Sequence, residues 1–80
     1  MPKKMMNFHY SITIRWSDED NAYLVELPEL YGKGRFATHG DSYEEALKNG
    51  LEVMELLVDV TTRKGQPLPM VETVAQVIEG

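Results

Sequence analysis

The sequence predicts one α+β domain, in which an antiparallel sheet is covered by a single long helix. Two short segments alternate apolar and polar residues on either side of a polar turn, as in a hairpin. A capping signal then opens a stretch whose apolar residues recur with helical spacing. The chain has 80 residues, the length of a single domain, so we assign residues 1–80 to one domain and expect residues 1–6 to be flexible.

The first strand is predicted over residues 8–16. Its apolar residues occupy every second position, the pattern of a half-buried strand: Phe8, Tyr10, Ile12, Ile14 and Trp16. A short polar turn leads to a second strand over residues 22–27, and the two form an antiparallel hairpin. Pro28 ends the second strand because it has no N–H to donate. We expect residues 29–34 to be a loop and residues 35–39 a short third strand.

A long helix is predicted to begin at Ser42. Ser42 and Glu45 have the spacing of a capping box, although Asp41 and Glu44 have the same spacing one residue earlier. Apolar residues then recur about every 3.6 residues over roughly five turns. Gly65 is expected to supply a left-handed C-terminal turn. Inside the helix a glycine costs about 1 kcal/mol, so its use at residue 50 indicates a close approach of the helix to the sheet.

The end of the chain has two possible structures. Residues 66–69 contain two prolines and form an extended linker that cannot continue the helix. For residues 70–80, a helix would align Val71, Val74, Ala75 and Ile78, whereas a strand would align Val71, Thr73, Ala75 and Val77. The one long helix covers only one face of the sheet, which leaves the other face as a reasonable surface for a partner.

The composition disfavours several classes of function. The net charge is −5, from 13 acidic and 8 basic residues, and the basic residues are scattered, so we expect no direct binding of nucleic acid. No apolar run approaches the roughly 20 residues of a membrane span, and the start lacks an apolar signal core, so a cytoplasmic protein is expected. With no cysteine available for disulfides, a domain this short is expected to self-associate as a dimer or tetramer.

No group of residues indicates catalysis, a metal or a cofactor. His9 and His39 stand on the polar sides of strands with no nucleophile signalled nearby. The acidic residues of the first turn are explained by local backbone hydrogen bonds, and those near residue 42 by helix capping. We therefore expect a protein that is not an enzyme.

In order and spacing, five stretches together resemble the HicB-like antitoxin family: residues 10–14, 18–25, 27–30, 39–47 and 65–69. The resemblance implies a partial RNase H-like fold of order β-β-β-α-β, in which the last segment is a strand. It also implies an antitoxin that binds and neutralises a HicA-like toxin, a small basic mRNA interferase, by covering its RNA-binding surface. Many members add a C-terminal DNA-binding segment, for which too few residues follow Pro69. The alternative is a stand-alone, oligomeric HicB-like regulatory or scaffolding protein.

The likeness to RNase H does not indicate a nuclease. Two-metal nuclease chemistry needs converging carboxylates, and an RNase H-type site places one of them on the first strand. The strand predicted up to Trp16 carries none. We expect the acidic side chains of the hairpin and the following loop to contact the basic partner instead. These candidate partner-binding residues are Asp18, Glu19, Asp20, Glu26 and Glu29.

Overall fold

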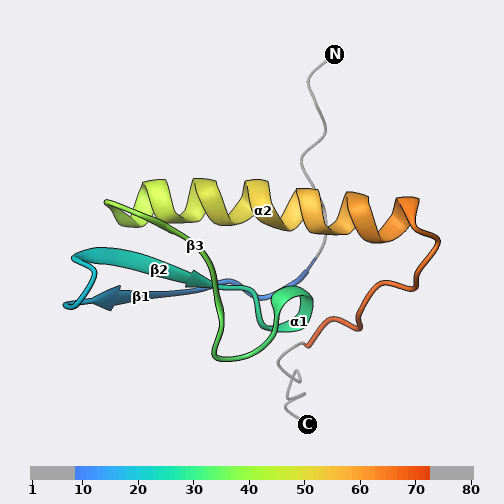
Figure 1. Ribbon diagram of the computed structural model, residues 1–80, viewed down its shortest axis with the longest axis horizontal. Helices are drawn as coiled ribbons and strands as arrows, with labels where there is room; N and C mark the ends of the chain where they lie inside the picture. The colour runs from blue at the N-terminus through green and yellow to red at the C-terminus, as the bar shows by residue number, and fades with distance from the viewer. Residues whose placement is uncertain (1–8, 73–80) are drawn as a thin grey trace, which may run out of the picture.

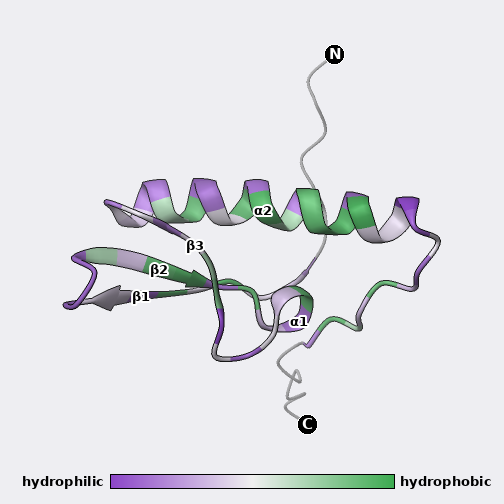
Figure 2. Ribbon diagram, viewed as in Figure 1, coloured by the Kyte–Doolittle hydropathy of each residue, from purple (hydrophilic) through white to green (hydrophobic). Residues whose placement is uncertain are grey.

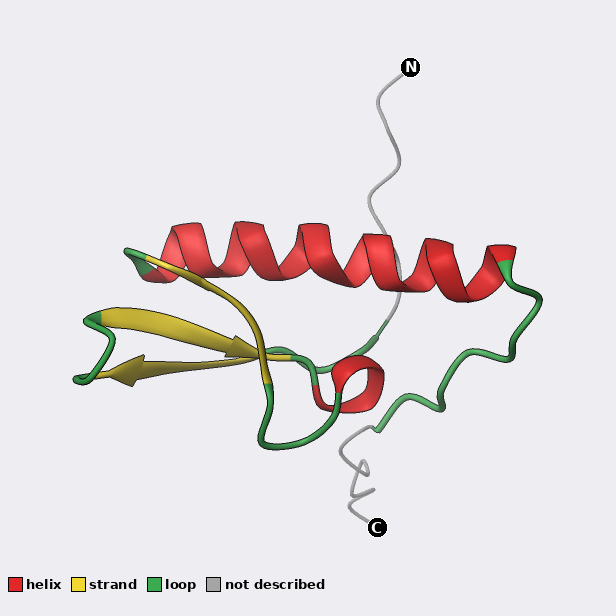
Figure 3. Cartoon of the chain, viewed as in Figure 1, coloured by secondary structure: helices red, strands yellow, loops and turns green. Residues whose placement is uncertain are grey.

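The computed structural model describes residues 9–72, and the flexible start predicted for residues 1–6 lies outside this range. The described residues form a three-stranded antiparallel sheet of order β1-β2-β3, with one long helix packed on it (Figures 1 and 3). This confirms the predicted α+β class with an antiparallel sheet and a covering helix. The elements are β1 (Thr13–Ser17), β2 (Ala22–Glu26), α1 (Pro28–Tyr31), β3 (Phe36–Gly40) and α2 (Tyr43–Arg63).

β1 is shorter than the strand predicted over residues 8–16. Regular pairing with β2 begins only at Thr13. The prediction was wrong for residues 9–12, because β2 ends before Pro28 and offers these residues no ladder to join. The alternation of apolar residues still holds in space, since Tyr10 is buried in the core.

A tight turn joins β1 to β2, as the polar sequence predicts. The Ser17 hydroxyl accepts the Asp20 N–H at 3.1 Å and donates to the Asp20 carboxylate at 3.0 Å. Asn21 ends the turn with φ of 54°, in the left-handed region that asparagine adopts more readily than most residues. The predicted antiparallel hairpin is therefore confirmed.

A single helical turn, α1, follows β2 where a loop was predicted over residues 29–34. Pro28 stands at its first position, which suits the fixed φ and the missing N–H of proline. The Tyr31 N–H donates to the Leu27 carbonyl at 2.7 Å. The loop prediction was wrong for residues 29–31, because the proline that ends the strand also begins a helix.

β3 lies one residue later than predicted and contains a bulge. Glu26 pairs with Phe36. The preceding residue, Val25, pairs with Thr38, so Ala37 is an extra residue in β3. Ala37 packs against the core while Phe36 stays exposed. Such a bulge leaves the extra residue without a partner on the neighbouring strand and bends the bulged strand.

α2 begins where the capping box predicts. The Ser42 hydroxyl accepts the Glu45 N–H at 3.0 Å, which makes Ser42 the N-cap and excludes the alternative start at Asp41. The Glu45 carboxylate accepts the Asp41 N–H at 2.6 Å rather than that of Ser42. The reciprocal half of the box is therefore displaced by one residue.

α2 ends in the left-handed turn predicted at Gly65, whose φ is 72°. The Gly65 N–H donates to the Thr62 carbonyl at 3.0 Å, and the Gln66 N–H donates to the Thr61 carbonyl at 3.1 Å. These two bonds are the Schellman pattern, which satisfies carbonyls that the end of a helix otherwise leaves unpaired.

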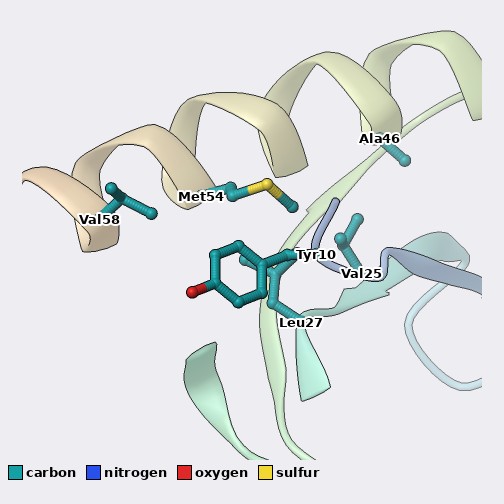
Figure 4. Packing of buried hydrophobic residues seen from close by; sticks show 6 residues of the cluster. All are labelled: Tyr10, Val25, Leu27, Ala46, Met54 and Val58. Carbon is teal, nitrogen blue, oxygen red and sulfur yellow. The ribbon is translucent and has the colours of Figure 1, made fainter. Parts of the chain in front are cut away.

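The core lies between α2 and the sheet, and the apolar side of α2 faces it (Figures 2 and 4). Its buried side chains are Tyr10, Val25, Leu27, Ala46, Met54 and Val58. A Cβ placed on Gly50 would lie 3.0 Å from Cγ1 of Val25, tighter than most packing contacts. The close approach predicted at this glycine is therefore confirmed.

After α2 the chain runs back past α1 (Figure 1). Residues 66–72 have no regular structure, in agreement with the predicted linker. The Tyr10 hydroxyl donates to the Pro69 carbonyl at 2.5 Å, which fixes this segment to the core. Of the last element predicted over residues 70–80, all but the first three residues lie outside the described range.

Candidate partner-binding surface

Three of the five predicted partner-binding residues lie together at the tip of the hairpin. Asp18, Glu19 and Asp20 are exposed in the turn between β1 and β2, and we call them the acidic turn. Asp18 accepts the indole N–H of Trp16 at 2.7 Å. The carboxylate of Asp20 is held by Ser17, as described above. Both aspartates thus have fixed positions at the surface, where their charges face solvent.

The other two predicted residues lie at the opposite end of β2. With a rise of about 3.4 Å per residue, the strand from Ala22 to Glu26 separates the two groups by roughly 14 Å. Glu26 accepts the N–H of Gly34, so it closes the loop before β3. The structure therefore does not bring all five carboxylates into one cluster.

Glu29 connects three segments of the chain. Its carboxylate accepts the N–H of Ser11 at 2.9 Å, the hydroxyl of Ser11 at 3.0 Å and the N–H of Glu72 at 3.0 Å. Partial burial raises the pKa of Glu29, but these hydrogen bonds stabilise the charged form and bring the pKa below its usual 4.5. Lys33 pairs with Glu72 at 3.6 Å beside it. Glu29 thus links α1 to the segments that contain Ser11 and Glu72, a structural role that the sequence analysis did not foresee.

A row of three aromatic rings lies next to the acidic turn. Trp16 meets the ring of Tyr23 edge-on, with centroids 4.9 Å apart, and Tyr23 meets the ring of Tyr43 at 4.3 Å. We call these three residues the aromatic ladder. The sequence analysis assigned them to separate apolar patterns. The signal that could have joined them is the short turn, which pairs Trp16 with Tyr23 across the hairpin.

The face of the sheet that points away from α2 is open in the described part of the chain. Arg15, Leu24 and His39 form one row across the three strands of this face. A shallow hollow of about 440 Å³ lies on it. The hollow is lined by Asp20, Ala22, Leu24, Phe36 and His39. A face with apolar residues and single charges suits contact with a protein surface.

Other kinds of site have less support. Within residues 9–72, no three histidine, aspartate or glutamate side chains are placed so that they could hold a metal ion. His9 and His39 are both exposed. None of the helices in this range is long and apolar enough to cross a membrane.

No protein-family model, curated protein or solved structure was found to match this chain.

Proposed function

We propose that this chain is a HicB-like antitoxin that acts in the cytoplasm without catalysis of its own. It binds and neutralises a HicA-like toxin, a small basic mRNA interferase. The observation that carries the proposal is the acidic turn, whose exposed carboxylates stand at the edge of an open sheet face. A net charge of −5 attracts a basic partner, and complementary charge raises the association rate and the specificity of binding.

The family likeness supplies the identity of the partner. Apart from the single turn α1 between β2 and β3, the order β1, β2, β3, α2 is the one that the resemblance implies for the first four elements. The last strand of the partial RNase H-like fold, which the resemblance implies within residues 70–80, stays a prediction, since residues 70–72 have no regular structure and the others lie outside the described range. Backbone chemical shifts of the whole chain, measured by NMR, are expected to be strand-like there, and helical shifts would contradict the fold assignment.

The test is co-expression with any adjacent gene that encodes a small basic protein. We expect that protein to stop growth when expressed alone, and this chain to restore growth and copurify with it. Because the attraction is between exposed charges, raising the salt concentration should slow association. A neighbour that neither binds nor stops growth would refute the antitoxin function.

Charge reversal is best done in the acidic turn. Glu26 and Glu29 each accept a backbone N–H, so reversing their charges would disturb the fold as well as the binding. Glu19→Lys instead changes an exposed turn residue and is expected to slow association. A matched control is Glu52→Lys, since Glu52 is exposed on α2 and far along the chain from the turn.

A stand-alone oligomeric HicB-like protein is the second candidate. It is supported by apolar side chains on the outer part of α2, where Leu56 is 58% exposed and Val60 is 37% exposed. Such residues are used to bury surface between copies of a small domain. Light scattering at tens of micromolar should then show a dimer or tetramer, which Leu56→Glu should dissociate. A monomer under these conditions would refute self-association.

A further inference from the structure

The aromatic ladder leaves two large rings in water although it adjoins the core. Tyr23 in the middle is half-buried and packs against the core. Trp16 is 47% exposed and Tyr43 is 62% exposed. Residues of these types dominate the binding energy of protein interfaces, because they offer a large rigid surface at a small cost in conformational entropy.

Gly40 explains why the ladder can form. It is the residue of β3 that pairs with Tyr23, and it has no side chain to cover the Tyr23 ring. A Cβ there would lie 2.4 Å from the backbone nitrogen of Ala46, so β3 and the start of α2 are in direct contact. This contact brings Tyr43, the first residue of α2, to the ring of Tyr23.

One exposed ring is hydrogen-bonded to a carboxylate, and the other is followed by a carboxylate in the sequence. Asp18 is hydrogen-bonded to Trp16 at 2.7 Å, and Glu44 follows Tyr43 in the first turn of α2. Two basic residues are close to the rings in the sequence. Arg15 lies on the opposite face of the sheet, in the row with Leu24, and Lys48 lies one helical turn beyond Glu44. The carboxylate that a hydrogen bond places beside the ladder is that of Asp18.

We infer that the aromatic ladder and Asp18 form a docking site for an arginine side chain of a basic protein partner. A guanidinium group stacks on the faces of tryptophan and tyrosine rings, and it forms hydrogen bonds to a carboxylate in the same plane. The occupant follows from charge complementarity, since the rings attract a cation and the carboxylate of Asp18 beside them is negative. This inference rests on the proposed function for the nature of the partner, and it names where the partner is held.

Trp16 is the single tryptophan of the chain, so its fluorescence reports directly on the site. The probe is a peptide of alternating arginine and glycine, compared with one of alternating glutamine and glycine. The arginine peptide is expected to change the emission of Trp16 saturably, and the glutamine peptide to leave it unchanged. Equal effects of the two peptides, or no saturation, would overturn the inference.

Two variants locate the binding. Tyr43→Leu removes an exposed ring, and Asp18→Asn removes the charge but keeps an oxygen that accepts the Trp16 N–H. Each is expected to weaken binding of the arginine peptide about 2- to 5-fold. Asp59→Asn is the matched control, because it removes the same charge from the far end of α2 and should leave the affinity unchanged. If all three variants bind the peptide like the wild type, the inference is wrong.

The two proposals can fail separately. Peptide binding that needs Tyr43 and Asp18, without a toxin among the neighbouring gene products, would retain the arginine site and refute the antitoxin function. Toxin binding that is unchanged by Tyr43→Leu and Asp18→Asn would retain the function and refute the site. Urea denaturation of each variant establishes that it is folded.

Discussion

Glu29 holds three separate segments together, and its replacement by glutamine is expected to lower the free energy of unfolding. The carboxylate accepts three hydrogen bonds, two from Ser11 and one from the backbone of Glu72. Glutamine has one oxygen left to accept, and its NH2 group would face donors. Hydrogen bonds to a charged group contribute about 1.5 kcal/mol at the lower end of the range, which suits a half-buried site. Two of the bonds are to Oε2, so a glutamine with its oxygen at that position loses one bond and keeps two in the weaker, uncharged form, and we expect a loss of about 2 kcal/mol.

Urea denaturation measures this loss. For a small domain the free energy of unfolding falls by about 1 kcal/mol for each molar of urea, so the midpoint should drop by roughly 2 M. Glu19→Gln is the control, because it removes the same charge from an exposed position in the acidic turn. We expect Glu19→Gln to shift the midpoint little.

The pH dependence of the difference in stability between wild type and Glu29→Gln separates the effect of the charge from that of the side-chain shape. Because hydrogen bonds lower the pKa of Glu29 in the folded protein, its stabilisation is fully present above the unfolded value near 4.5. It is lost as the pH falls through the folded pKa. The difference between wild type and Glu29→Gln should therefore shrink as the pH falls below 4.5. An equal difference at pH 7 and pH 3, or an equal effect of Glu19→Gln, would refute this reasoning.

Three further substitutions test the backbone geometry by urea denaturation. Ser42→Ala should cost about 1 kcal/mol by removing the acceptor of the Glu45 N–H, and no change would refute the assigned helix start. Gly40→Ala should cost about 3 kcal/mol, because its Cβ would collide with the backbone of Ala46. Gly65→Ala should cost about 1 kcal/mol, since φ of 72° strains any residue with a Cβ, and a stabilised variant would contradict the Schellman turn.

Features set by neighbouring residues could be predicted from the sequence. The N-cap at Ser42, the left-handed turn at Gly65 and the tight packing at Gly50 depend on local chemistry or on helical spacing. The late start of β1 could not be predicted, because it depends on where the partner strand ends. The bulge at Ala37 depends in the same way on the register between two strands.

In the candidate site, too, the features set by neighbouring residues could be predicted and those set by distant residues could not. The exposed carboxylates of the acidic turn followed from the turn residues themselves. The structural role of Glu29 did not, because its partners lie 18 and 43 positions away along the chain. The aromatic ladder also joins three elements, and sequence periodicity treats each element separately. Alternation along one strand gives no information on which ring of a later helix will reach it.

The hydrogen bond between Tyr10 and Pro69 constrains the order in which the structure can form during synthesis. The two residues are 59 positions apart, and the chain emerges from its N-terminus. The hairpin, β3 and α2 all precede Pro69, so all of them are synthesised before this bond can form. Until Pro69 emerges, the hydroxyl of Tyr10 lacks this acceptor. The bond that fixes residue 69 to the core therefore forms only after the sheet and α2 have been synthesised.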